Sequence, residues 1–244
     1  MRYLCLGSYN GSAYQGWQKQ INTPTIQGSI EEVLSKFFDQ EINIYASGRT
    51  DTGVHAKGQT FHFDLDKDDL DFNRFLYSIN QMLPKDIAIL DIKPVDKDFH
   101  ARFSAKGKEY RYFISYKQKD VFENALKYNC LLSFDDDLFE KTLTYFIGKH
   151  NFMNFTSKEE DEEGFIREIY DIKVIDNKVD EIEIIFKGNG FMRYMIRYLV
   201  GTALAVAMNK IGLDEVKTLL ETNERKIVSY KAPAEGLYLM SVLY

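Results

Sequence analysis

The sequence is poor in the residue types on which several kinds of protein depend. It has only two cysteines and four histidines among 244 residues, and it has no apolar run long enough to span a bilayer. We expect both cysteines to be small buried hydrophobic residues rather than a disulfide or a redox pair. The histidines are scattered without metal-ligand spacing, so we expect no metal site. These residues are Cys5, Cys130, His55, His62, His100 and His150.

The chain also lacks an excess of positive charge. Its formal net charge is −6 at pH 7, which argues against a generic nucleic-acid-binding protein, for which a basic domain is expected. The charge is uneven, however, because residues 97–119 contain seven Lys or Arg and two acidic residues, a local charge of +5. Residues 159–163 are all acidic, as expected for a solvated loop. A local basic face is therefore compatible with the overall sign, although the basic stretch could equally be a solvated strand surface.

Length and composition predict a globular protein with a sizeable core. Hydrophobic residues make up 45% and charged residues 28% of the chain. The first residues become polar too early for a signal peptide, so we expect a cytoplasmic protein. At ~150 residues per domain the chain makes one large domain or two small ones. We place a boundary near Phe103, between domains 1–103 and 104–244. No proline-rich linker marks it, so we expect the two halves to share one mixed or antiparallel sheet with a central cleft.

Hydrophobic periodicity predicts an α+β fold with two similar halves. Strands are expected where apolar residues alternate, and helices where they recur at helical spacing. The first half then has the order β-α-β-β-α-β, typical of ferredoxin-like folds, and the second half resembles it in order. In the first half we predict strands at 2–9, 42–46, 61–65 and 87–95, and helices that begin after Thr23-Pro24 and at Asp71. In the second half we predict strands at 109–115, 169–175, 181–186 and 236–244, and helices from Asp135, from Met192 to Lys210, and from Asp214.

The stretch Ser47–Gln59 between two predicted strands is the most informative part of the chain. It reads S-G-R-T-D-T-G-V-H-A-K-G-Q, and we interpret it as a loop held by two strands of one sheet. Its glycines permit positive φ or close backbone approach, and its Asp-Thr-Gly is typical of a turn. A loop that only reverses the chain does not need the charged and polar residues that it also carries, Arg49, Asp51, His55 and Lys57. The alternative is a turn stabilised by an Arg49–Asp51 ion pair.

The string S-G-R-T-D-T-G-V-H-A closely resembles the signature of the tRNA pseudouridine synthase A family, in which the aspartate is catalytic. Further stretches resemble motifs of that family in the same order along essentially the whole chain. They are Tyr9–Gly11 with Tyr14–Gln18, Asp98–Ser104, Lys108–Tyr112, Asn189–Arg197 and Ala234–Leu239. Asn10 stands where the family more often has aspartate.

The resemblance implies an isomerase that converts uridine to pseudouridine in the anticodon stem-loop of tRNA, at positions 38–40, and that acts as a homodimer. The reaction breaks the N1–C1′ bond of a uridine, turns the base and joins C5 to C1′. It needs no redox cofactor, and the sequence shows no nucleotide-cofactor motif. The resemblance makes Asp51 the nucleophile, which must be ionised. Arg49 or Arg197 nearby would lower its pKa.

The resemblance also assigns roles to residues of the second half. Tyr110 would stack on the target base and take the proton from C5, and Leu237 would line the base pocket; the alternative for both is plain core packing. Arg197 would be the active-site arginine. It lies four residues after Arg193, which places both on one face of the predicted helix, near its start. The helix dipole disfavours cations there, so this placement suggests an anionic partner, Asp51 or an RNA phosphate. For Arg193, an ordinary surface arginine is an alternative that fits about as well. The expected substrate contacts are Arg49, Tyr110, Leu237, Arg193, Arg111, Arg102 and His55.

Three other functions are weighed against this one. The same chemistry could act on ribosomal RNA, because nothing in the chain reads target sequence. A non-catalytic RNA-binding protein on the same fold is disfavoured, because binding alone does not require the combination of Asp51, Arg49, Tyr110 and Arg197. An aspartate-dependent hydrolase is disfavoured by the absence of metal ligands and of a nucleophile–histidine pair.

Overall fold

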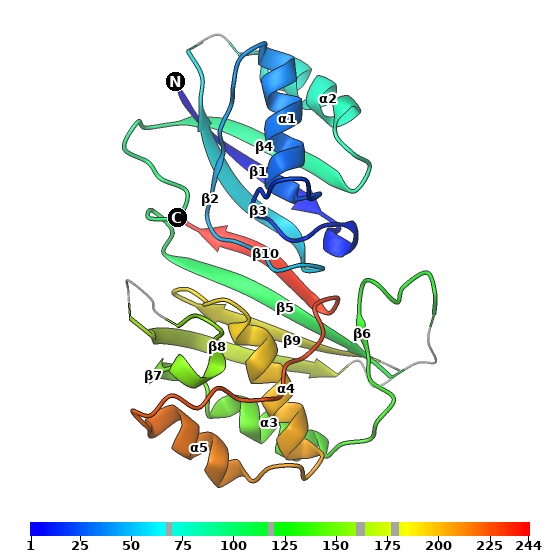
Figure 1. Ribbon diagram of the computed structural model, residues 1–244, viewed down its shortest axis with the longest axis vertical. Coiled ribbons are helices and arrows are strands. Elements are labelled where there is room, and N and C mark those ends of the chain that lie inside the picture. Colours follow the sequence, from blue (N-terminus) through cyan, green and yellow to red (C-terminus); the bar gives the residue numbers. More distant parts are fainter. Residues whose placement is uncertain (67–69, 117–119, 160–163, 177–180) are drawn as a thin grey trace. The chain divides into compact units, whose positions relative to one another are not determined.

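The computed structural model describes the chain except residues 67–69, 117–119, 160–163 and 177–180 (Figure 1). Lys117, Lys119 and all but the first residue of the predicted acidic loop therefore lie outside the described residues. The chain forms two compact units, residues 1–106 with 238–244 (unit 1) and residues 107–237 (unit 2). In the described part, no helix combines the length and the apolar character that crossing a membrane requires.

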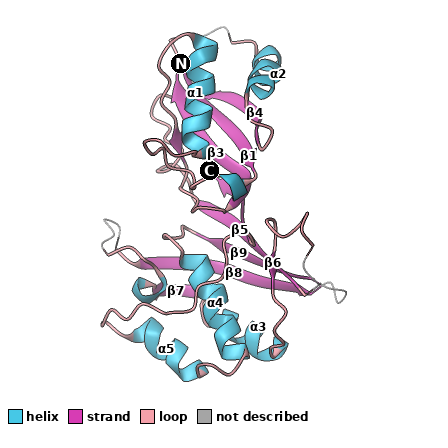
Figure 2. Cartoon of the chain, turned by 45° about the vertical axis from the view of Figure 1, so that its right-hand side comes forward, coloured by secondary structure: helices cyan, strands magenta, loops and turns pink. Residues whose placement is uncertain are grey.

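Unit 1 has the β-α-β-β-α-β order predicted for the first half of the chain. Its elements are β1 (Arg2–Tyr9), a 3₁₀ turn (Gly11–Ala13), α1 (Ile26–Phe38), β2 (Tyr45–Ala46), β3 (His55–Asp64), α2 (Phe72–Met82), β4 (Ile87–Val95) and most of β10 (Leu237–Leu243). The sheet has the order β4-β1-β3-β10, with β1 antiparallel to both neighbours and β2 antiparallel to β3. Helix α1 packs beside α2, and α2 packs against β4, in the upper part of Figure 2.

The last strand joins the N-terminal half, although the predicted domains placed it with the C-terminal half. β10 begins at the last residue of unit 2 and continues in unit 1. There Tyr238 and Leu239 pair in parallel with His55 and Ala56. This pairing joins residues that are far apart in the sequence, so no local pattern could indicate it.

β3 begins earlier than predicted, and the loop before it is correspondingly shorter. The strand starts at His55, which leaves residues 47–54 as the loop. Apart from Lys57 and Asp64, every residue of β3 is buried, so the alternation that would have revealed the strand is missing. Gly58 is required in this strand, because a Cβ there would lie 2.1 Å from the carbonyl oxygen of Met240 in β10.

The helix starts follow the capping rules, with one shift. Asp71 and Asp135 cap their helices as predicted, each accepting a hydrogen bond from the backbone of the third residue after it. The first helix is capped by Thr25 rather than Thr23. The side chain of Thr25 accepts a hydrogen bond of 3.3 Å from the backbone N–H of Gly28.

Unit 2 is also an α+β unit. Its elements are β5 (Gly107–Ser115), β6 (Tyr128–Asn129), α3 (Asp136–Thr144), β7 (Gly148–Asn151), a 3₁₀ turn (Met153–Phe155), β8 (Ile166–Asp176), β9 (Glu181–Gly188), α4 (Met195–Ala207) and α5 (Leu213–Glu221). The sheet has the order β5-β9-β8-β7, with antiparallel pairs, and β6 lies parallel to β5. The short strands β6 and β7 were not predicted, because segments of two and four residues carry too little periodicity.

Helix α4 forms the centre of unit 2. Every residue of this helix except Arg197 is buried, and the helix packs against α3. It begins at Met195, three residues later than predicted, because Tyr194 has φ 62° and ψ 0°, in the left-handed region. A residue in that conformation interrupts the right-handed helix that the apolar pattern predicted.

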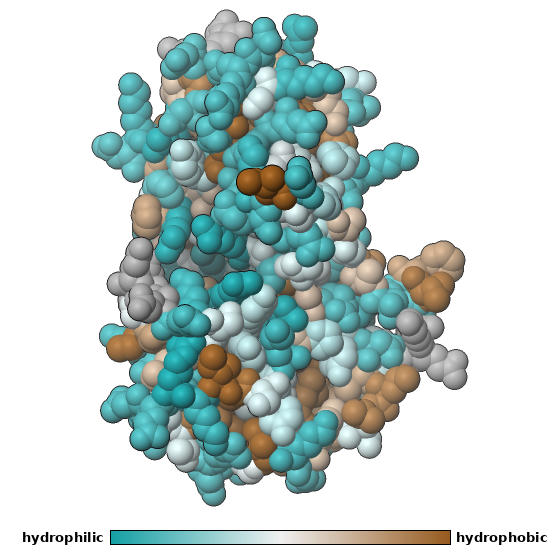
Figure 3. Space-filling view, in the orientation of Figure 1, coloured by the Kyte–Doolittle hydropathy of each residue, from teal (hydrophilic) through white to brown (hydrophobic). Residues whose placement is uncertain are grey.

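The α+β class predicted from the sequence is confirmed in both units. Cys5 and Cys130 are buried free thiols, as expected. Hydrophilic residues cover most of the face shown in Figure 3, with hydrophobic side chains scattered among them. The common sheet and the cleft across the join stay predictions.

Candidate active site

Asp51 lies at the turn of the loop that leads into β3. The backbone N–H of Val54 donates to the carbonyl of Asp51 at 3.1 Å, and Gly53 has φ 77°. The predicted Asp-Thr-Gly turn is therefore confirmed. A hydrogen bond between backbone atoms therefore closes the turn that carries Asp51.

A buried polar network supports this turn from within unit 1. The hydroxyls of Tyr9 and Thr50, the residue before the aspartate, lie 2.8 Å apart. Gln59 donates to the carbonyl of Gly48 at 2.9 Å and accepts from the hydroxyl of Ser47 at 2.9 Å. Burial raises the pKa of the Tyr9 hydroxyl, which therefore stays protonated. Buried polar groups that satisfy one another in this way favour a single geometry of the loop.

The segment Tyr14–Gln18 packs directly against the same loop. The backbone N–H of Trp17 donates to the carbonyl of Thr50 at 3.0 Å. Gly16 has φ 88°, and a Cβ there would lie 2.8 Å from the Thr50 oxygen and 3.1 Å from the carbonyl carbon of Asp51. This segment resembles the first family motif. Its glycine, Gly16, lies against the backbone of the turn that carries Asp51, and a side chain would not fit there.

Asn10 and His55 hold the 3₁₀ turn that follows β1. The Asn10 side chain accepts a hydrogen bond of 3.0 Å from the backbone N–H of Ser12, a capping role that an aspartate would also perform. His55 accepts a hydrogen bond of 3.1 Å from the backbone N–H of Gly11. Its ring stacks on that of Tyr238, with the centroids 4.5 Å apart. Only 1% of His55 is exposed, which favours a supporting role over the predicted contact with substrate.

The two arginines predicted in unit 1 lie on its surface. Arg49 is exposed and makes no ion pair within the described residues, so the alternative of a structural Arg49–Asp51 pair does not apply. The guanidinium of Arg102 lies 5.4 Å from the ring centroid of Phe103, which is itself 71% exposed. A cation beside an exposed aromatic ring suits a nucleic-acid surface.

Tyr110 and Arg111 are neighbours on β5 with different surroundings. The ring of Tyr110 meets that of Phe191 edge-on, with the centroids 5.3 Å apart. Arg111 forms ion pairs with Glu109 at 2.9 Å and Glu183 at 2.7 Å. Its charge is therefore already compensated within unit 2, and its predicted contact with RNA stays a prediction.

The predicted helix-face arrangement of Arg193 and Arg197 was wrong, because Arg193 precedes α4. The two guanidinium groups nevertheless meet at one ring, 4.8 Å and 5.2 Å from the centroid of Tyr194. Arg197 is oriented by a 2.8 Å hydrogen bond from its Nε to the carbonyl of Ala232. Leu237 opens β10 and is 5% exposed.

The predicted site residues are divided between the units. Unit 1 holds Arg49, Asp51, His55 and Arg102, and unit 2 holds Tyr110, Arg111, Arg193, Arg197 and Leu237. The supporting residues Tyr9, Thr50 and Gln59 were not singled out from the sequence. Thr50 and Gln59 belong to the central motif and Tyr9 opens an earlier one, so their importance was visible, but their hydrogen bonds were not.

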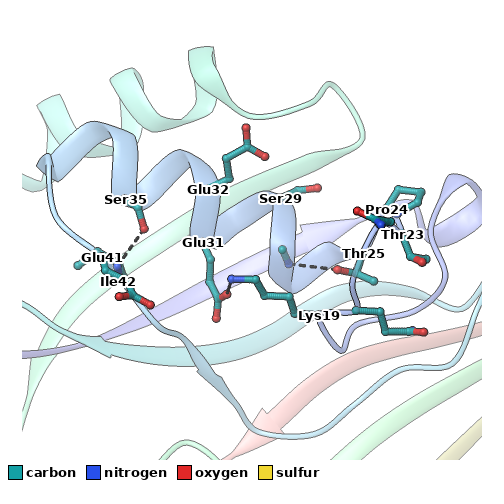
Figure 4. A pocket seen from close by; sticks show the side chains of 13 residues that line it. Lys19, Thr23, Pro24, Thr25, Ser29, Glu31, Glu32, Ser35, Glu41 and Ile42 are labelled. Carbon is teal, nitrogen blue, oxygen red and sulfur yellow. Dashed lines mark hydrogen bonds and ion pairs between the residues drawn. The ribbon is translucent and has the colours of Figure 1, made fainter.

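A pocket of about 510 Å³ lies beside α1 (Figure 4). Glu31 lines it and is only 3% exposed. Its carboxylate accepts hydrogen bonds from Lys19 at 2.9 Å, Gln27 at 2.9 Å and the backbone of Ile44 at 3.1 Å. Glu31 therefore ties the segment before β2 to α1. None of the predicted site residues lines this pocket.

A family model described as tRNA pseudouridine synthase matches residues 6–104 and 143–244 of the chain. The chain belongs to this family. It is similar to proteins named tRNA pseudouridine synthase A. That of Acetivibrio thermocellus is 39% identical over 97% of this chain and 96% of the relative. That of Bacillus pumilus is 38% identical over 100% and 99%, and that of Listeria monocytogenes serotype 4a is 39% identical over 100% and 99%. The family predicted from the motifs is thereby confirmed, and it is a family of isomerases.

Proposed function

We propose that this protein converts uridine to pseudouridine in the anticodon stem-loop of tRNA, with Asp51 as the nucleophile. The observation that carries the proposal is the turn at Asp51, whose backbone is fixed by Tyr9, Thr50 and Gly16. The carboxylate is thus carried on a loop whose backbone is held by its surroundings. Such pre-positioning on a rigid support is what a reacting group requires. Membership of the family supports the reaction and the class of substrate.

The reaction is balanced without a cofactor. The N1–C1′ bond breaks with the help of the Asp51 carboxylate, the base turns, and C5 bonds to C1′. C5 then loses a proton while N1 gains one. By the family resemblance, Tyr110 stacks on the target base and takes the C5 proton, Arg197 is the active-site arginine, and Leu237 lines the base pocket.

Substrate binding depends on cations at the surface. A uridine within a helix must leave the stack before its glycosidic bond can be attacked, so the enzyme has to hold the backbone on either side. Arg49, Arg102 and Arg193 are exposed and suited to phosphate groups. We also propose that the protein is a cytoplasmic homodimer, as the resemblance implies. Sedimentation measurements test the dimer, and a monomer at micromolar concentration would contradict it.

Ribosomal RNA is the competing substrate. The similar proteins are named for tRNA, which favours tRNA here. Mapping pseudouridines in the RNA of cells with and without this protein separates the two. Loss of a modification in ribosomal RNA, with every tRNA unchanged, would show that the substrate proposed here is wrong.

Asp51→Asn tests the chemistry most directly, because it keeps the size of the side chain and removes its charge. Asp39→Asn is the matched control, since Asp39 is exposed at the end of α1 with φ 52°, where asparagine is tolerated. Both variants should unfold at a midpoint close to that of the parent. Asp51→Asn should bind tRNA equally or slightly more tightly, because a negative charge facing the RNA is lost.

The readout is the release of tritium from C5 of labelled uridine in a tRNA transcript. The control variant should release tritium at the parent rate, and Asp51→Asn should release none that can be detected. A substantial rate in Asp51→Asn would refute the nucleophile proposed here. A large loss of stability in that variant would mean that the carboxylate holds the fold.

A further inference from the structure

Three cationic side chains surround one aromatic ring in unit 2. The Nζ of Lys231 lies 4.4 Å from the ring centroid of Tyr194. The guanidinium groups of Arg193 and Arg197 lie 4.8 Å and 5.2 Å from the same centroid. Arg193 also donates a 3.0 Å hydrogen bond to the Tyr194 hydroxyl. Lys231 is far from the arginines in the sequence, and no motif pointed to it.

The backbone places Lys231 at this ring. Its neighbour Ala232 exchanges two hydrogen bonds with Arg197, one from the Ala232 N–H to the Arg197 carbonyl at 2.9 Å and one from the Arg197 Nε to the Ala232 carbonyl at 2.8 Å. On the next turn of α4, a Cβ at Gly201 would lie 2.7 Å from the carbonyl oxygen of Tyr230. The glycine therefore lets this segment lie directly on the helix. Lys231 thus belongs to a segment that is fixed against α4.

Arg193 and Lys231 have no compensating carboxylate among the residues that the structure describes. The first turn of α4 contains no acidic residue. Within the described part of the chain, neither Arg193 nor Lys231 takes part in an ion pair. The face of an aromatic ring attracts cations, but it carries no net charge that could offset their mutual repulsion. The arrangement is therefore suited to receive an anion.

Lys217 shows that a lysine over a tyrosine ring is not by itself unusual in this unit. Its Nζ lies 5.1 Å from the ring centroid of Tyr145, and it has Asp214 at 3.2 Å as its counter-charge. Lys231 has a similar aromatic contact without the carboxylate. The difference between the two lysines is therefore the missing negative charge.

We propose that Lys231, together with Arg193, binds a phosphate group of the tRNA backbone; this rests on the proposed function. An ammonium group and a guanidinium group that lie 4.4 Å and 4.8 Å from the same ring centroid offer a phosphate both a point charge and a forked donor. The Nε of Arg197 is held by the carbonyl of Ala232, and by the family resemblance this arginine acts in the reaction. All three cationic side chains lie against the ring of Tyr194.

The test compares Lys231→Ala with Lys217→Ala, which removes a lysine with the same kind of ring contact. The affinity for a fluorescein-labelled tRNA transcript is measured by anisotropy across a series of chloride concentrations. Each phosphate contact contributes about one to the slope of log affinity against log salt. Lys231→Ala should weaken binding about three- to tenfold at low salt and reduce the slope by about one. Lys217→Ala should change neither, and Lys231→Arg should restore most of the slope.

An unchanged slope in Lys231→Ala would overturn the proposal, even if affinity fell, because the lysine would then act through packing. Inorganic phosphate at matched ionic strength separates a site for free phosphate from one for RNA. Phosphate that binds through Lys231 without displacing tRNA would also overturn the assignment to RNA. The tritium assay on the parent protein is independent of these outcomes. A parent protein that binds tRNA through Lys231 but forms no pseudouridine would refute the proposed function and leave the phosphate site standing.

Discussion

Replacing Gly16 with alanine tests whether the loop that carries Asp51 must be held rigidly. Gly16 lies beside the turn with φ 88°, a conformation that alanine adopts only with strain. Its new Cβ would lie 2.8 Å from the carbonyl oxygen of Thr50. The same Cβ would lie 3.1 Å from the carbonyl carbon of Asp51 and 3.1 Å from the nitrogen of Thr52. Because all three neighbours are backbone atoms, the methyl group can be accommodated only if the loop moves.

The size of the effect follows from these distances. Ordinary contacts begin at 3.4 Å, so the Thr50 oxygen must move by about 0.6 Å. A misplacement of ~1 Å at a reacting centre costs about 10²-fold in rate, so a shift of about 0.6 Å corresponds to roughly tenfold or slightly more. The left-handed conformation adds about 1–2 kcal/mol of strain for an alanine. In a protein of this size that lowers the unfolding midpoint by roughly 2–8 °C.

Gly164→Ala is the matched control. Gly164 has φ 69°, and among the described residues other than its chain neighbours no atom lies within 4 Å of the Cβ that alanine would add. It should show the same backbone strain without touching the loop. Both variants should therefore lose a few degrees of thermal stability, but only Gly16→Ala should lose rate in a single-turnover tritium-release assay with saturating tRNA.

The affinity for tRNA should stay near the parent value in both variants, because neither change removes a cation. A parent-like rate in Gly16→Ala, with stability lowered as in the control, would show that the loop tolerates displacement. The view that the Tyr14–Gln18 segment positions Asp51 would then be wrong.

Three other changes give distinct expectations. Tyr110→Phe keeps the ring, whose stacking on a base is worth roughly 1–3 kcal/mol. Binding should survive while product formation falls by ~10²-fold or more if the hydroxyl takes the C5 proton; near-normal turnover would restrict the residue to stacking or to the core. Reversing Lys106 and Lys108 to Glu should weaken tRNA binding, steeply so at low salt, without lowering the rate at saturation; a flat salt dependence would remove the basic stretch from substrate binding. Burial, with Arg2 and a neighbouring histidine, lowers the pKa of His62 to about 4, so the folded state disfavours its protonated form. The stabilisation from neutral His62 is therefore full above about pH 6.5 and is lost as the pH falls toward 4, with a loss of about 1–2 kcal/mol at pH 5. His62→Gln should flatten that part of the curve of unfolding free energy against pH. An unchanged curve would mean that other groups dominate the pH dependence.

The sequence by itself determined the features that depend on short-range patterns. Alternating and helical spacings located β1, β4, α1 and α2, because each element buries one face and repeats with its own period. Asp71 and Asp135 marked their helix starts because a cap acts within one turn. The motif around Asp51 and the turn that it forms were also evident, since the turn is encoded by adjacent residues.

Only the tertiary structure decided the features that depend on distant partners. β3 begins at His55 because β1 and β10 cover that stretch, and burial on both sides removes the alternation that would have revealed it. Arg193 lies outside α4 because Tyr194 adopts a left-handed conformation that an apolar repeat does not encode. Lys231 reaches the same ring because Gly201 admits its segment against the helix. Contacts of this kind join residues that have no common local pattern, and they arise only when the chain packs.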